Sequence, residues 1–280
     1  MSATTLRAEP FANGFCFGEG PRWHDGRLWF TDGPAGVIRT VDDSGRLEVA
    51  IETDRPSGLG WLPDGTLVLC TLLEARVSFA TPDGETVHHD LSDLAWSTND
   101  LVVTTEGRIY VDLYDRTESG GIAGSLGLVS RDGAVRVVAT DLATPNGLGV
   151  LPNGELVVSE THGRRLLAFI IGDDGDLAER RVFAELGEGR HPDGLCVDAT
   201  GAVWVGCYDT AEFLRVRDGG EVTHRIDVAG GWAVAPALGG ADGRDLYLVV
   251  NETTHEKHGR GESAGRIERA RVDVPGVHQR

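Results

Sequence analysis

The chain has 280 residues, of which 40% are hydrophobic and 39 are glycine, and its formal net charge is −18. This length is large for an ordinary domain but typical of a barrel or propeller that closes as one unit, so we expect a single domain over residues 1–280. The negative charge repels phosphate backbones and anionic headgroups, which excludes nucleic acid and membrane surfaces as expected partners.

The first residues lack a basic stretch followed by an apolar run, and no run of about 18 apolar residues occurs anywhere. These absences predict a cytoplasmic protein without a membrane segment. The four cysteines are scattered and form no CxxC pair. Cys70, Cys196 and Cys207 lie within apolar strand patterns, so we expect them to be small buried hydrophobic residues.

An apolar strand, a turn with glycine and a second apolar strand recur six times. The copies span 21–30 around Gly26, 59–70 around Gly65, 101–111 around Gly107, 148–159 around Gly154, 195–206 around Gly201 and 232–250 around Gly243. Successive turn glycines are 39, 42, 47, 47 and 42 residues apart, a step that holds roughly four strands, or one propeller blade. The pattern predicts an all-β, six-bladed β-propeller with four antiparallel strands in each blade, because radial packing buries both faces of every hairpin.

Further turns at Asp83-Gly84, Asp132-Gly133 and Asp174-Gly175 indicate the outer hairpins of blades. The tail at 265–274 alternates at its end, and we expect residues 6–9 to pair with the same blade and so fasten the ring. The segment 251–265 reads as a polar loop in which His255 and His258 are solvated. The tryptophans Trp23, Trp29, Trp61 and Trp204 are expected to pack in or beside strand cores.

One repeat position is unusually polar. About eight residues before the turn glycine, where each chain segment enters the innermost strand, the first five repeats carry Glu19, Ser57, Asn99, Asn146 and Asp193, and the sixth offers Trp232. Oxygen donors that converge from several blades onto one axis suit a hard divalent cation. Glu19, Asn146 and Asp193 would form a mixed site of acids and amide at the centre of the ring. Asn and Asp before glycine also serve as turn residues, which is the alternative interpretation.

Several motifs in this order resemble the gluconolactonase and regucalcin (senescence marker protein) family. They are GEGPRW at 18–23, TND at 98–100, PNGL at 145–148, and PDGLCVD at 192–198 followed by GAVWV at 201–205. The similarity extends from about Glu19 to Val274. It implies a six-bladed propeller of lactone hydrolases with one divalent metal in the channel, held by Glu19, Asn146 and Asp193. Asn99 matches the residue that lies beside the metal and touches water or substrate.

The resemblance implies hydrolysis of a small-molecule lactone or ester. A metal on the carbonyl oxygen stabilises the oxyanion that forms when water attacks. We therefore expect three catalytic residues: Asp193 as general base, Glu19 as the charge-neutralising ligand, and Asn99. Ca²⁺ is the expected ion, and Zn²⁺, Mg²⁺ or Mn²⁺ would accept the same oxygen ligands.

Substrate contacts are expected from Asn99, Asp100, Tyr114, His162 and Tyr208. His162 would hydrogen-bond a substrate oxygen or shuttle a proton, or else make an ordinary hydrogen bond at the rim. His191, which precedes a proline, is expected to face solvent.

Two positions depart from the sugar-lactone members of the family. Ser97 replaces an arginine that reads substrate hydroxyls, and Leu101 replaces the usual glycine after Asn-Asp. Both changes predict a less polar channel and a more apolar lactone or ester.

Two other functional classes stay open at this stage. A propeller of this shape could catalyse a condensation, as strictosidine synthase-like proteins do, or bind a partner without turnover. The α/β-hydrolase reading has no support, because no Gly-x-Ser-x-Gly elbow occurs in the chain.

Overall fold

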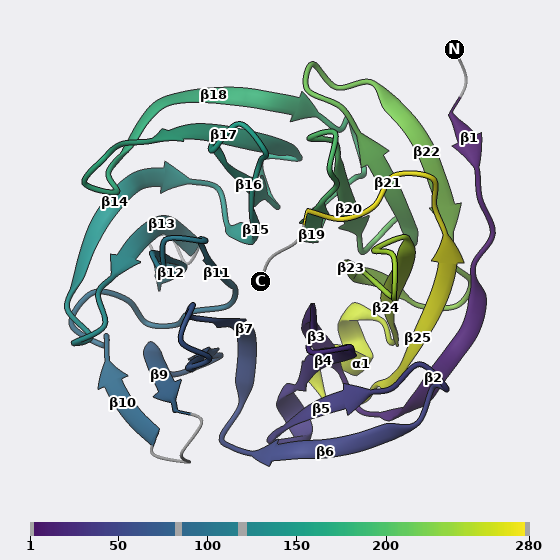
Figure 1. The fold of residues 1–280 in the computed structure, drawn as a ribbon, viewed down its shortest axis with the longest axis horizontal. Coiled ribbons are helices and arrows are strands. Elements are labelled where there is room, and N and C mark those ends of the chain that lie inside the picture. The colour runs from purple at the N-terminus through teal and green to yellow at the C-terminus, as the bar shows by residue number, and fades with distance from the viewer. Residues whose placement is uncertain (1–2, 82–85, 117–121, 278–280) are drawn as a thin grey trace.

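The structure is a computed structural model that describes residues 3–81, 86–116 and 122–277. Six sheets are arranged around a central axis, each running from an inner strand to an outer strand (Figure 1). The prediction of a six-bladed propeller with four antiparallel strands in each blade is therefore confirmed.

Blades are numbered here in chain order. Blade one comprises β3 (Gly18–His24), β4 (Arg27–Asp32), β5 (Val37–Val41) and β6 (Leu47–Glu52), and blade two β7 (Pro56–Trp61), β8 (Leu67–Thr71), β9 (Arg76–Ala80) and β10 (Thr86–Asp90). Blade three comprises β11 (Leu101–Val103), β12 (Ile109–Arg116), β13 (Ile122–Val129) and β14 (Val135–Leu142), and blade four β15 (Pro145–Val150), β16 (Leu156–Glu160), β17 (Arg165–Ile171) and β18 (Leu177–Glu185). Blade five comprises β19 (Pro192–Val197), β20 (Val203–Cys207), β21 (Glu212–Val216) and β22 (Val222–Asp227), and blade six β23 (Trp232–Gly239), β24 (Asp245–Glu252), β25 (Ala264–Arg271) and β2 (Glu9–Phe15). Outside this pattern are β1 (Thr4–Thr5), which adds a parallel fifth strand to β22, the 3₁₀ turn η1 (Gly33–Ala35) and the helix α1 (His255–Gly259).

The six turn glycines all adopt positive φ angles, from +72° to +87°. A side chain is strained in this region, which is why glycine marks the turn between the inner and second strands of every blade. The outer turns at Gly133 and Gly175 also form, each closed by a backbone hydrogen bond of 2.9 Å. The turn predicted at Asp83-Gly84 lies outside the described residues.

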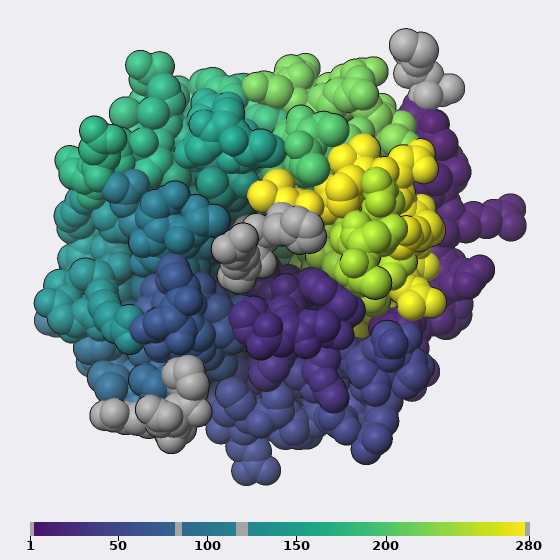
Figure 2. Space-filling view, viewed as in Figure 1, coloured from purple at the N-terminus to yellow at the C-terminus, as the bar shows by residue number. Residues whose placement is uncertain are grey.

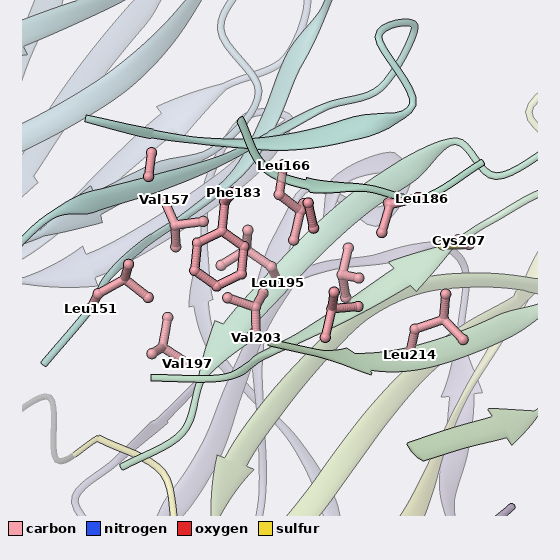
Figure 3. Packing of buried hydrophobic residues seen from close by; sticks show 14 residues of the cluster. Leu151, Val157, Leu166, Phe183, Leu186, Leu195, Val197, Val203, Cys207 and Leu214 are labelled. Carbon is pink, nitrogen blue, oxygen red and sulfur yellow. The ribbon is translucent and has the colours of Figure 1, made fainter. Parts of the chain in front are cut away.

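Buried hydrophobic side chains fill the interfaces between blades. Within the described residues they form six clusters, and each cluster joins two neighbouring blades. Between blades four and five, for example, Val157 and Leu166 pack with Leu195 and Val203 (Figure 3). The predicted packing roles are confirmed for the cysteines and tryptophans, since Cys70, Cys207 and Trp204 are buried and Cys196, Trp23, Trp29 and Trp61 pack partly buried against the clusters.

The N-terminal segment closes the ring, as predicted, although the pairing strand begins at Glu9 and residues 6–8 connect it to β1. β2 pairs antiparallel with β25, so the last blade contains strands from both ends of the chain (Figure 1). A second closure lies in the interior, where the Asn251 side chain accepts a hydrogen bond from Gly18 N and donates one to Gly18 O, both at 3.0 Å. The first and last blades are thereby joined beside Glu19.

The prediction of a polar loop over 251–265 is wrong in part. Asn251 is buried at the end of β24, and His255–Gly259 forms α1, with the Thr254 hydroxyl accepting a hydrogen bond from Lys257 N at 3.2 Å. A threonine at the N-cap stabilises a helix start that hydrophobic periodicity does not reveal. Within the described ranges, neither α1 nor any other helix is long and apolar enough to cross a membrane.

The two ends of the central channel differ. We call the end where the inner strands begin the mouth, and the opposite end the far end. The C-terminal residues cross the far end, where Val277 N hydrogen-bonds Val197 O and Ala199 N hydrogen-bonds Pro275 O. In the space-filling view the yellow C-terminal segment reaches toward the middle of the molecule (Figure 2). Arg22, Cys196, Leu238 and Gly276 are among the residues that line a cavity of about 100 Å³ at this end.

Candidate functional site

The polar repeat position lies at the mouth in every blade. Glu19, Ser57, Asn146 and Asp193 are each the second residue of an inner strand, Trp232 is the first residue of β23, and Asn99 precedes β11. Neighbouring inner strands pack against one another around the axis. Six side chains from distant parts of the sequence therefore occupy equivalent places around one opening.

A local irregularity turns these side chains away from the regular sheet. In blade one the pairing between the inner and second strands shifts immediately after Glu19, and in blades two, four and five the shifted stretch contains Ser57, Asn146 and Asp193. Such bulges re-aim a side chain and are common beside active sites. The glycine that follows is equally necessary, because a Cβ on Gly147 would lie 2.5 Å from Leu195 N and one on Gly194 would lie 2.4 Å from the Ala235 Cβ.

Hydrogen bonds link the side chains of three successive blades, and the acid of the next blade lies beside them. The Ser57 hydroxyl donates to Asn99 Oδ1 at 3.0 Å, and Asn99 Nδ2 donates to Asn146 Oδ1 at 3.1 Å. The Asn146 side chain in turn lies close enough to Asp193 to lower the pKa of its carboxyl group. We call Ser57, Asn99, Asn146 and Asp193 the polar chain. Asn99 and Asn146 keep some exposed surface, whereas Asp193 is 7% exposed.

Negative charge accumulates around this chain. Burial raises the pKa of Glu19 well above its usual value, and the nearby carboxylates of Asp193, Asp100 and Asp112 raise it further, although Glu19 keeps some surface at the mouth. Burial and the charge of Asp100 raise the pKa of Asp193 to about 7, against the hydrogen bond from Asn146. A bound cation would offset the mutual repulsion of these acids.

The donor set fits a divalent metal on chemical grounds. In the described part of the chain, no three His, Cys, Asp or Glu side chains gather closely enough to hold a metal ion. The predicted ligands are two carboxylates and an amide, and the structure brings both Asn146 and Glu19 near enough to Asp193 for the groups to affect one another's pKa values. Oxygen donors of this kind suit Ca²⁺ or Mg²⁺.

Asp112 supports the site, although its role was not predicted from the sequence. Its buried carboxylate accepts hydrogen bonds from Asn99 N at 2.6 Å and from Asp100 N at 3.0 Å. It therefore holds the backbone that presents the Asn99 side chain. The signal in the sequence was an acid within the apolar run Ile109-Tyr110-Val111-Asp112-Leu113, because a buried charge is retained where it has partners.

The predicted substrate contacts separate into two groups. Asp100 and Tyr114 are buried and bonded to other parts of the protein. Asp100 forms an ion pair with Arg22 at 3.1 Å, and the Tyr114 hydroxyl donates a hydrogen bond to the Pro145 carbonyl. His162 and Tyr208 lie at the mouth, where His162 Nδ1 is 2.6 Å from the Thr144 hydroxyl and Tyr208 is half-buried. Among the predicted contacts, Asn99 belongs to the polar chain, where only Asn146 separates it from Asp193.

Three expectations about side-chain direction are corrected. Ser97 is fully buried, and its hydroxyl accepts from Leu73 N at 3.1 Å and donates to Thr98 O, so it does not face the channel. Leu101 is buried between blades two and three, where it contributes to the core and not to the polarity of the channel. His191 is half-buried and hydrogen-bonds the Asp209 carboxylate, because the loop after β20 folds over it.

Comparison with known proteins agrees with this architecture. Pentonolactonase XacC of Haloferax volcanii is 28% identical over 266 residues, which cover 93% of this chain and 88% of that protein. The structure of a calcium-binding protein, regucalcin, from Agrobacterium tumefaciens superimposes with a TM-score of 0.78 at 20% identity and covers both chains fully. A gluconolactonase structure from Xanthomonas campestris gives a TM-score of 0.73 at 24% identity, over 95% of this chain and 89% of that one. The family model described as SMP-30/Gluconolactonase/LRE-like region matches residues 17–252, so the chain belongs to this family.

Proposed function

We propose that this protein is a metal-dependent hydrolase that opens the ring of a lactone. The observation that carries the proposal is the polar chain, in which equivalent side chains of four blades lead to the buried acid Asp193. Glu19 lies close enough to Asp193 for the Asp193 charge to raise the pKa of Glu19. Membership of the family and the similarity to a protein named pentonolactonase support the same reaction class.

Glu19, Asn146 and Asp193 would hold the metal, and Ca²⁺ is the ion that we expect. When bound, such an ion draws electron density from the lactone carbonyl and makes water easier to deprotonate. The buried carboxylates around Glu19 would serve to bind this cation, because acids this close repel one another unless a cation or a proton lies between them.

The side chains of the polar chain supply the remaining chemistry. Asp193 accepts a proton from the attacking water as the new C–O bond forms, and returns it to the ring oxygen as the old acyl bond breaks. Asn146 lies beside the Asp193 carboxylate and favours its charged form. Asn99 lies next in the chain, where its amide can position water or the carbonyl oxygen, and Asp112 fixes the Asn99 backbone.

A hydrolysis screen tests the proposal. Purified protein is dialysed against a chelator, then supplied in turn with Ca²⁺, Mg²⁺, Mn²⁺ or Zn²⁺, and acid release from sugar, aliphatic and aromatic lactones is followed by pH-stat titration. We expect acid release that the chelator abolishes and at least one of these ions restores. Acid release that persists after complete removal of metal would contradict metal dependence. No acid release from any lactone would contradict hydrolysis and favour a condensing or ligand-binding propeller.

A further inference from the structure

The sixth repeat differs from the other five at the mouth. Trp232 occupies the position that carries a polar side chain in the other blades. Its strand, β23, packs between β19 and β3. Trp232 therefore begins the strand that lies between the one carrying Asp193 and the one carrying Glu19, and it is half-buried.

Other aromatic rings continue outward from Trp232. The ring centroid of Trp232 lies 5.2 Å from that of Tyr208, 5.0 Å from His255 and 5.2 Å from His258. The Phe17 ring is 4.9 Å from His258, and the His191 ring is 5.9 Å from Tyr208. We call these six side chains the aromatic arc: Phe17, His191, Tyr208, Trp232, His255 and His258.

The helix α1 builds the outer part of the arc. His255 and His258 are three residues apart, a spacing that places two side chains on one face of a helix. Both are exposed, as the sequence predicted, yet both rings lie against Trp232. Partial burial of the ring, and next the charge of His255, lower the pKa of His258 and so favour its uncharged form.

The arc adjoins the polar chain on the side of Asp193. The Tyr208 backbone N–H donates to His191 O, and His191 immediately precedes Pro192 and Asp193. Burial and the charges of Asp209 and Asp193 raise the pKa of Tyr208 to about 12, so the Tyr208 hydroxyl lies near enough to Asp193 to be affected by its charge. A substrate whose carbonyl reaches Asp193 would thus extend over these rings.

Three polar side chains near the mouth already have hydrogen-bond partners within the protein. His191 is bonded to Asp209, and His162 to the Thr144 hydroxyl. Ser97 is engaged with the backbone, away from the channel. The atoms engaged in these bonds are not available to a polyhydroxylated substrate, and the formal net charge of −18 disfavours an anionic one.

We infer that the substrate is an uncharged lactone with an aromatic substituent, which stacks on the aromatic arc with Trp232 as its main contact. This inference rests on the proposed lactone hydrolysis and adds the class of substrate. Faces of tryptophan, tyrosine and histidine favour a planar aromatic ring over an alkyl chain of equal size, because ring pairs gain interaction energy beyond their buried area.

Four lactones with the same six-membered ring test the inference. They are δ-valerolactone, its phenyl-substituted and butyl-substituted derivatives, and gluconolactone, each assayed with the metal-loaded wild-type protein. We expect kcat/KM for the phenyl derivative to exceed that for δ-valerolactone by about tenfold and to exceed that for the butyl derivative by several fold. Equal values for the phenyl and butyl derivatives, or a preference for gluconolactone, would overturn the inference.

Variants of Trp232 locate the preference. In Trp232→Leu the ratio of kcat/KM for phenyl to butyl derivatives should fall toward one, whereas Trp232→Phe should keep most of it. Trp61→Leu, in blade two at the far end of the channel, is the matched control and should leave the ratio at the wild-type value. An unchanged ratio in Trp232→Leu would overturn the inference.

Binding of a lactam, which is not hydrolysed, separates this inference from the proposed function. We expect the phenyl-substituted lactam to quench tryptophan fluorescence of the wild-type protein and to bind several fold more tightly than the butyl-substituted lactam. If no lactone is hydrolysed, the hydrolase proposal fails, and these two dissociation constants still decide whether the arc recognises an aromatic ring. Equal lactam affinities would overturn the inference even if hydrolysis is observed.

Discussion

The mouth of the propeller contains two sectors built on the same repeat position. In the polar sector, hydrogen bonds join Ser57, Asn99 and Asn146, and Asn146 lies beside Asp193, whose charge acts on Glu19. In the aromatic sector, Trp232 meets its neighbours through ring contacts, and the short helix α1 supplies two of them. The five polar positions thus share one backbone geometry that fixes side chains for chemistry. The sixth position, Trp232, instead provides an aromatic surface on which a substrate could bind.

The substitution Asp193→Asn is expected to have the largest effect, because it removes the general base and a metal ligand from the polar sector. We expect kcat for the best lactone to fall by about 10²- to 10⁴-fold. The thermal unfolding midpoint should not fall, since the amide is nearly isosteric and relieves the repulsion with Glu19. Asp43→Asn, on the exposed turn between β5 and β6, is the control and should keep wild-type turnover. Turnover of Asp193→Asn near the wild-type rate would remove catalysis from this sector.

Calcium should stabilise the protein through the polar sector and not through the aromatic one. At about one hundred times its Kd, Ca²⁺ should add about 2.7 kcal/mol to the free energy of unfolding, which corresponds to an increase in Tm of roughly 5–10 °C. Glu19→Gln should lose this increase, and its metal-free form should be more stable than the metal-free wild type because one of several neighbouring carboxylates is gone.

Differential scanning calorimetry with and without Ca²⁺ measures this increase in Tm and tells the two sectors apart. Trp232→Leu should keep the calcium-dependent increase in Tm, because its side chain offers no oxygen ligand. Loss of the increase in Trp232→Leu, or its survival in Glu19→Gln, would mean that the division between the sectors is wrong.

Asn251 forms the joint between the sectors. It is the second-last residue of β24 in blade six and holds Gly18, next to Glu19, through two hydrogen bonds of 3.0 Å. Asn251→Ala leaves a buried backbone N–H and C=O unpaired, so we expect the free energy of unfolding in urea to fall by about 1–3 kcal/mol. Asn13→Ala, on the exposed side of β2, should change it by less than about 0.5 kcal/mol. Equal urea midpoints for Asn251→Ala and wild type would show that this joint carries no stability.

The fold and the polar sector were predictable because both depend on local sequence signals. Each turn between the inner and second strands needs a positive φ angle and therefore a glycine, so Gly26 through Gly243 mark the blades. Counting back from each glycine reaches the start of the inner strand, because the hairpins of the first five repeats have nearly equal length. Glu19, Asn146 and Asp193 were found in this way, and Ser57 was counted but left out of the expected site.

The remaining features depend on long-range packing that no local pattern reports. α1 has five residues and relies on the Thr254 cap and on contact with Trp232, so it shows no helical period. Ser97 and Leu101 were assigned to the channel, but the loop before β11 turns both side chains into the protein. The role of Asn251 arises from contact with a residue 233 positions earlier in the chain, which exists only when the ring is closed.

The smallest expected effect tests whether the polar chain acts as a unit. Ser57 donates to Asn99 at the end of the chain farthest from Asp193, so Ser57→Ala removes one hydrogen bond worth about 0.5–1.5 kcal/mol, and kcat should fall by about two- to tenfold. In an Asp193→Asn background the same substitution should cost much less, because residues that act through one another are not additive. Ser44→Ala, in an exposed turn, should change kcat in neither background. Equal losses from Ser57→Ala in both backgrounds would mean that Ser57 does not act through Asp193, and the polar sector would then consist of separate residues.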